Sequence, residues 1–181
     1  YLQHHQRLGS ASFERVVPRL GLARILQALA HNPLLLGTPD PWFKKLEAEA
    51  REAVLRAWLA ILPQHPGYGE VLIRHLDPTR HAAERERTFQ GWREARQDAE
   101  GVIGLAALQR LPQDLQRREA RGDLKAVPAL ATRPAVRLRY CSLLPWAEAA
   151  AVLQLYIGHP EGEVRGGAVA LLLTIAGQEP E

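Results

Sequence analysis

Prolines and glycines divide this sequence into segments of helical length, and this division constrains the fold more than any other feature. Many of the 13 prolines and 14 glycines lie between segments in which apolar residues recur every three or four positions. That period is typical of amphipathic α-helices, and the breaks are typical of the turns that join them. We therefore predict an all-α fold of antiparallel helix pairs, arranged either as an α-α superhelix or as an irregular helical bundle.

The composition also favours helices over strands. Leucine and alanine, both strong helix formers, account for 56 of the 181 residues, whereas Val, Ile, Thr, Tyr, Phe and Trp together account for only 32. We predict a single all-helical domain over residues 1–181 and, because the chain contains no methionine, we expect it to be a piece of a longer one. The four tryptophans lie in predicted helices, where we expect core or edge packing rather than base stacking: Trp42, Trp58, Trp92 and Trp146.

Asp-Pro pairs mark two of the expected helix starts. An aspartate accepts the unpaired N–H groups of a first helical turn, and a proline at the first helical position sacrifices no hydrogen bond. Asp40-Pro41 predicts a helix that continues to residue 63, and Asp77-Pro78 predicts a long helix that is interrupted near residues 101–104. A first helix is expected over 12–31, and two short helices over 123–140.

Residues 145–177 form the most regular part of the pattern. A segment from Pro145 to Ile157 stops at Gly158, and a second from Pro160 to Ala176 stops at Gly177. The connection is short, so the two helices should pack antiparallel as a helical hairpin. Both segments are apolar on more than one face, which predicts that a partner covers the outer side of the hairpin.

The second half of this hairpin resembles a known repeat family. Residues 159–177 read HPEGEVRGGAVALLLTIAG, in which an acidic residue is followed by Val-Arg, a small residue and spaced leucines: Glu163, Val164, Arg165, Ala168, Leu171 and Leu172. This order is similar to the second helix of a HEAT-type repeat. The resemblance covers one repeat, and it implies a HEAT-like α-solenoid built from stacked helix pairs.

Positive charge gathers immediately before the hairpin. The chain carries a net charge of +3, but residues 110–139 alone hold eight basic and three acidic side chains. Arginine binds phosphate oxygens through paired N–H donors, so this segment is a candidate for contact with a nucleic-acid backbone. A solvated helix face is the alternative interpretation. The candidate phosphate-binding residues are Arg110, Arg117, Arg118, Arg121, Lys125, Arg133, Arg137 and Arg139.

A second candidate site contains histidine and carboxylate side chains. His81 and Glu84 are three residues apart on a predicted helix, and His75 lies just before the turn that contains Asp77. Imidazole and carboxylate groups on one helix face are ligands for a divalent metal. The alternative is a charged, solvated surface in which Asp77 serves as a helix cap.

Other classes of function lack their sequence signals. Cys141 is the only cysteine, which excludes an intrachain disulfide and a cysteine-based zinc site. The chain has no glycine-rich phosphate loop and no nucleophile motif, so we expect no cofactor. Its apolar runs are shorter than the roughly 20 residues that span a bilayer, and its first residues show no signal-peptide core. These features predict a cytoplasmic protein that contacts no membrane.

The sequence favours binding over catalysis. We predict a non-catalytic protein-binding or scaffolding module, with a protein partner or a second copy held at the apolar 145–177 hairpin. Nucleic-acid binding through residues 110–139 is the first alternative. A metal-dependent enzyme that uses His75, His81 and Glu84 is the second.

Overall fold

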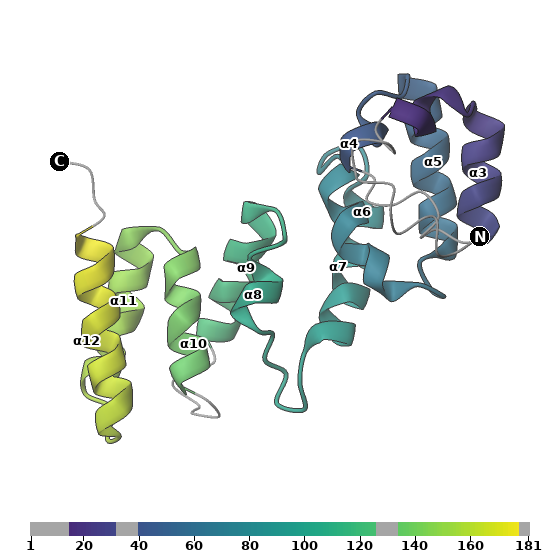
Figure 1. The fold of residues 1–181 in the computed structure, drawn as a ribbon. Helices are drawn as coiled ribbons and strands as arrows, with labels where there is room; N and C mark the ends of the chain where they lie inside the picture. The colour runs from purple at the N-terminus through teal and green to yellow at the C-terminus, as the bar shows by residue number, and fades with distance from the viewer. Residues whose placement is uncertain (1–14, 32–39, 126–133, 178–181) are drawn as a thin grey trace. The chain divides into compact units, whose positions relative to one another are not determined.

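The computed structural model describes residues 15–31, 40–125 and 134–177. Over these ranges the regular structure is helical, and the only β-type pairing is an isolated bridge between Gln97 and Ile103. The predicted all-α class with packed helix pairs is confirmed. The chain divides into two compact units, residues 1–95 and residues 96–181, a division that the sequence analysis did not anticipate (Figure 1).

The first unit contains the elements up to the end of α7. Its helices differ in length because glycines and tight turns interrupt the apolar pattern. In chain order they are η1 (Val17–Arg19), α3 (Leu22–His31), α4 (Asp40–Phe43), α5 (Ala48–Ile61), η3 (Pro66–Tyr68), α6 (Gly69–His75) and α7 (Ala82–Arg96).

The core of the first unit is apolar and rich in aromatic rings. Helix α3 packs against α5 through Ile25 and Leu29, which are fully buried. Trp42 and Phe43 of α4 lie over Trp58 of α5, with ring centroids 5.8 and 5.4 Å from the Trp58 ring. Burial of side chains this large is the main source of stability for a unit of this size.

Two of the helices predicted in this unit are interrupted. The helix expected over 12–31 breaks before α3, because Gly21 has a φ of +77°, a left-handed conformation that favours glycine. Residues 12–14 of that expected helix lie outside the described residues. The helix expected over 40–63 stops after Phe43 and restarts at Ala48, and this break lets the α4 rings fold onto α5.

The helix predicted after Asp77 ends at Arg96, and the second unit begins with a loop in which Gly101 has a φ of +75°. Of the two short helices predicted over 123–140, one is α10, while residues 126–133 lie outside the described part of the chain. In order the elements are α8 (Leu105–Leu108), α9 (Gln113–Lys125), α10 (Pro134–Tyr140), η5 (Cys141–Leu143), α11 (Trp146–Ile157) and α12 (Gly162–Ala176).

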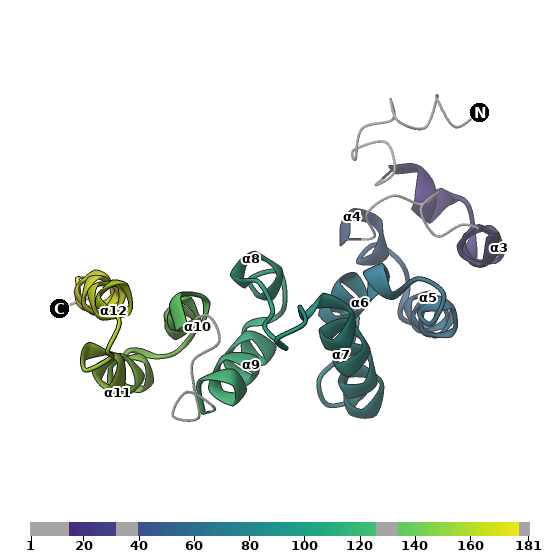
Figure 2. The same ribbon diagram turned by 90° about the horizontal axis from the view of Figure 1, so that it is seen from below.

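Helices α11 and α12 form the hairpin predicted over 145–177. They lie side by side and run antiparallel in Figures 1 and 2, and α12 also packs against α10. Ala149 and Leu153 of α11 and Ala168 of α12 are fully buried. Small residues at these contacts let the helix backbones approach closely.

Candidate functional site

The basic segment is spread over the turn before α9, over α9 itself and over α10. Arg110 precedes α9, which carries Arg117, Arg118, Arg121 and Lys125. Arg137 and Arg139 lie on α10, and Arg133 lies outside the described residues. Four of these side chains are exposed: Arg110, Arg118, Lys125 and Arg139.

Arg121 joins α9 to α11. Its Nε and Nη2 donate to the two carboxylate oxygens of Glu148 at 2.7 and 2.6 Å. This two-point hydrogen bond raises the pKa of Arg121 and lowers the pKa of Glu148. The positive charge of Arg121 is thus already paired with a carboxylate of the same chain.

Arg137 joins α10 to α9 in a more enclosed place. Its Nε lies 3.6 Å from Oδ2 of Asp123, and the two side chains are only 11% and 12% exposed. Removal of either partner of such an enclosed ion pair leaves the other charge unpaired in a poorly solvated place. This cost keeps the two side chains together. Two of the predicted phosphate-binding arginines therefore connect helices of their own unit, while binding of nucleic acid by the segment stays a prediction.

The structure places the three predicted metal ligands in separate surroundings. The ring of His75 lies against Phe43, with centroids 4.5 Å apart, and stacks on Trp58 at 6.1 Å. Glu84 lies 3.7 Å from Arg87. Across the described ranges, no group of three or more His, Cys, Asp or Glu side chains is placed to hold a metal ion.

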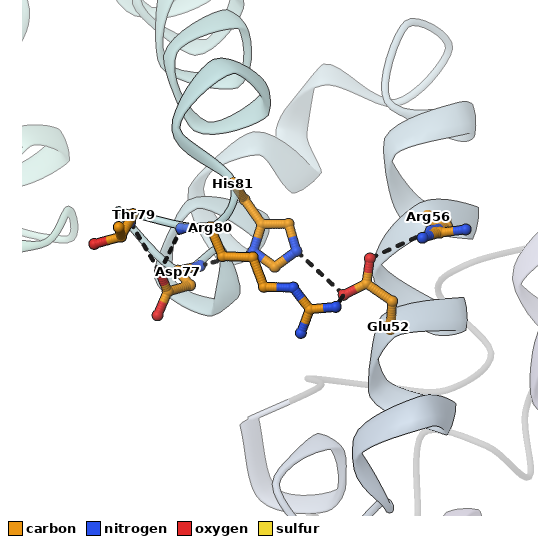
Figure 3. Close-up of polar contacts among 6 residues, drawn as sticks. All are labelled: Glu52, Arg56, Asp77, Thr79, Arg80 and His81. Atoms are coloured by element: carbon orange, nitrogen blue, oxygen red, sulfur yellow. Dashed lines mark hydrogen bonds and ion pairs between the residues drawn. The ribbon is translucent and has the colours of Figure 1, made fainter.

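His81, the third member, is held between two partners (Figure 3). Its Nε2 lies 3.2 Å from Oε2 of Glu52, and its Nδ1 accepts the backbone N–H of Asp77 at 3.2 Å. Because Nδ1 is an acceptor, a neutral ring carries its proton on Nε2 and donates it to Glu52. Neither nitrogen then offers a lone pair to a substrate, so this pair orders the 77–81 turn rather than serving as a base.

Asp77 caps a turn rather than a helix, because α7 begins only at Ala82. Its Oδ1 accepts the backbone N–H groups of Thr79 and Arg80 at 2.8 and 2.7 Å (Figure 3). These hydrogen bonds to the ionised form lower the pKa of Asp77. Residues 77–80 are exposed, in agreement with the charged-surface interpretation, but the helix cap expected at Asp77 is a turn cap instead.

Glu52 is the residue of this network that the sequence analysis missed. It lies on α5 and contacts Arg56 at 3.2 Å and Arg80 at 3.5 Å in addition to His81 (Figure 3). The hydrogen bond with His81 is the main cause of the lowered pKa of Glu52. The sequence offers no signal for this contact, because the two residues are 29 positions apart.

The surroundings of Cys141 do not favour a reactive thiol. Its side chain is fully buried, and burial raises the pKa of its thiol to about 12. A thiol in such surroundings stays protonated at neutral pH and is a poor nucleophile.

The α11–α12 hairpin exposes large apolar side chains. Leu155 and Ile157 of α11 are 66% and 43% exposed, and Val169 and Leu173 of α12 are 43% and 70% exposed. On α12 the exposed positions 166, 169, 170 and 173 follow helical spacing and carry no charge. They lie opposite the buried Val164 and Ala168, so α12 has one apolar face inside the unit and another outside it.

The chain matches no protein family, no curated protein and no solved structure. Among the described helices, none has the length and the apolar character needed to span a membrane. Any function must therefore be inferred from the geometry.

Proposed function

We propose that this chain is a non-catalytic protein-binding module and that the outer face of α12 is its contact surface. The observation that carries the proposal is the exposure of Leu173, the most exposed large apolar residue of the described chain, at 70%. Large apolar patches are uncommon on the surface of monomeric proteins. Where they occur, they often mark a site of contact with another protein. A HEAT-like arrangement would agree with it, since each helix pair of a solenoid presents a face to its neighbour.

The partner that fits this face is an α-helix. Gly166, Val169, Ala170 and Leu173 form a stripe along α12. Gly166 has no side chain, and a Cβ placed there would meet no atom within 4 Å. The helix surface is therefore recessed at Gly166, whereas the side chain of Leu173 protrudes from it. Ridges and hollows of this kind pack against a second helix.

A second copy of the chain supplies such a helix. If two α12 helices pair antiparallel about a twofold axis between Val169 and Ala170, Leu173 of each copy faces Gly166 of the other. Large then meets small at both ends of the contact, which is the self-complementarity that a twofold interface requires. The chain is therefore proposed to bind a second copy of itself through α12.

Sedimentation equilibrium over a range of concentrations tests the proposal. We expect the wild type to show reversible dimerisation and Leu173→Lys to weaken it at least about a hundredfold, because two buried leucines are lost from each dimer. Thr174→Lys is the matched control, since it adds the same charge at an exposed position beside the stripe.

Two results would contradict the proposal. One is a wild type that stays monomeric at every concentration. The other is a dimer that Leu173→Lys and Thr174→Lys weaken equally, since that would make added charge rather than the loss of Leu173 responsible.

A further inference from the structure

Helix α9 separates its charged side chains by burial. Two of its three carboxylates are enclosed in the second unit: Glu119 is 8% exposed, and the side chain of Asp123 is 12% exposed. The third carboxylate, Asp114, is exposed in the first turn. The cations of the later turns are exposed as well, and they are Arg118, Arg121 and Lys125. The outer face of α9 therefore carries three cations and one carboxylate, although acidic and basic residues alternate along the sequence.

Two of the charges in this region are already paired within the chain. Asp123 lies 3.6 Å from Arg137 of α10, and Arg121 donates to Glu148 of α11 at 2.7 and 2.6 Å. An anion that approaches the outer face of α9 would therefore meet chiefly Arg118 and Lys125.

Gly122 lies between these two cations on one stripe of α9. Positions three and four residues apart share a helix face, and along the axis Gly122 is about 6 Å from Arg118 and about 4.5 Å from Lys125. Glycine weakens a helix, yet a Cβ at Gly122 would meet no atom within 4 Å, so internal packing does not require it. The glycine leaves the helix backbone open to a bulky anion between two cationic side chains.

The composition of this face favours the backbone of a nucleic-acid duplex as that anion. Guanidinium and ammonium groups both bind phosphate oxygens. Along α9, which the structure describes from Gln113 to Lys125, no exposed side chain is apolar or aromatic. A helix that binds a membrane inserts apolar side chains, and a site for unpaired bases offers aromatic rings. A duplex requires neither, because its phosphates lie outside its bases.

We propose that the outer face of α9 binds the phosphate backbone of double-stranded nucleic acid. A phosphate lies over Gly122, and Arg118 and Lys125 donate to its oxygens and to those of its neighbours from either side. Phosphate contacts carry no base information, so binding is independent of sequence. The face shares no residue with the α12 contact surface, and neither proposal depends on the other.

Fluorescence anisotropy of a labelled duplex of about 20 base pairs and mixed sequence tests the proposal with the full chain. Two neutralised phosphates give a slope of about −1.8 in a plot of log affinity against log salt concentration. We therefore expect binding at about 50 mM salt that weakens about tenfold by about 200 mM.

Charge variants should change the affinity in opposite directions. Lys125→Gln should weaken binding about tenfold at about 50 mM salt and reduce the salt slope by about 1, because one phosphate contact is lost. Asp114→Asn should strengthen binding about twofold, because it removes the one exposed carboxylate of α9. Lys44→Gln is the matched control, since it removes the same charge at an exposed position of the first unit and should change neither quantity.

Gly122→Leu tests the close approach without any change of charge. It should fold normally, because a side chain at this position points into open space, and circular dichroism checks this. The leucine covers the backbone between Arg118 and Lys125, so duplex binding should fall at least about fivefold. Gly91→Leu is the matched control: Gly91 lies in α7, and a Cβ there also meets no atom within 4 Å.

Four results would overturn the proposal. The first is the absence of duplex binding at about 50 mM salt with protein at several hundred micromolar. The second and third are equal affinities of Lys125→Gln and Lys44→Gln, or of Gly122→Leu and Gly91→Leu. The fourth is displacement of the duplex by polyglutamate or by phosphatidylserine vesicles as effectively as by unlabelled duplex at equal charge, which would assign the face to an acidic protein or to a membrane.

Discussion

Residues 1–95 and residues 96–181 hold their helices together in different ways. In the first unit, the contact between α4 and α5 is made by aromatic rings, and Trp42 at its centre is fully buried. In the second unit the buried apolar residues of the helices are mainly aliphatic, and polar groups form further links. The N–H of Ile103 donates to the hydroxyl of Tyr140, which in turn donates to the carbonyl of Ile103, and the ion pairs of α9 reach α10 and α11.

This difference explains where the apolar residues of the second unit lie. Polar links with fixed geometry add to the apolar contacts between these helices, which bury aliphatic side chains such as Leu115, Leu138 and Leu153. The α11–α12 hairpin can then leave Leu155 and Leu173 on its surface and remain ordered. In the first unit the large aromatic side chains lie inside, so fewer apolar groups remain for a partner.

The largest effect on this comparison should come from Trp42→Ala. Removal of a fully buried indole that contacts Phe43 and Trp58 should lower the free energy of unfolding by about 4 kcal/mol. Urea denaturation followed by circular dichroism measures this loss. Trp146→Ala, at the partly exposed start of α11, is the control and should cost less than half as much. Equal losses would show that the two units do not differ in their dependence on aromatic burial.

A smaller effect should come from Tyr140→Phe, which removes one oxygen atom from the second unit. Tyr140 is 1% exposed, so the change leaves the N–H and carbonyl of Ile103 without their hydroxyl partner in a buried place. We expect a loss of about 2 kcal/mol in the free energy of unfolding, measured by urea denaturation. Tyr68→Phe in the first unit is the control, because no hydroxyl hydrogen bond of Tyr68 is found in the described contacts. If Tyr140→Phe and Tyr68→Phe lower the free energy of unfolding by similar small amounts, the hydroxyl of Tyr140 does not stabilise the second unit as the comparison requires.

The helical class and the C-terminal hairpin could be predicted from the sequence because both depend on local patterns. Apolar spacing and the glycines at 158 and 177 define α11 and α12 to within two residues of their observed ends. The break between Phe43 and Ala48 could not be predicted, since it depends on the packing of α4 rings on Trp58. Apolar periodicity continues through that break, and only tertiary contact ends the helix.

The candidate sites show the same limit. The sequence placed His81 with Glu84, because residues three apart share a helix face. In the structure His81 contacts Glu52, which comes from another helix. The arginine at 121 likewise has an internal partner, Glu148, 27 positions away. Charge counts along the chain predict where basic residues gather, but they do not reveal which of them are neutralised by distant carboxylates.

The smallest effect concerns two carboxylates, one in each unit, whose pKa values are lowered for different reasons. Backbone N–H groups of the 77–81 turn lower the pKa of Asp77, whereas the Arg121 side chain lowers the pKa of Glu148. Both groups favour the folded state above their ordinary pKa values of 3.8 and 4.5, and this contribution is lost as the pH falls through the lowered folded values.

High salt should separate the two causes. Mobile ions at about 1 M screen an exposed ion pair, and Arg121 and Glu148 are 47% and 41% exposed. Hydrogen bonds from fixed backbone N–H groups depend much less on ionic strength. In ¹³C NMR titrations we therefore expect the pKa of Glu148 to return toward 4.5 at high salt and the pKa of Asp77 to stay low. If both pKa values rise equally, the charge of Arg80 rather than the N–H groups of the turn lowers the pKa of Asp77. The first unit then relies on ion pairs as the second does.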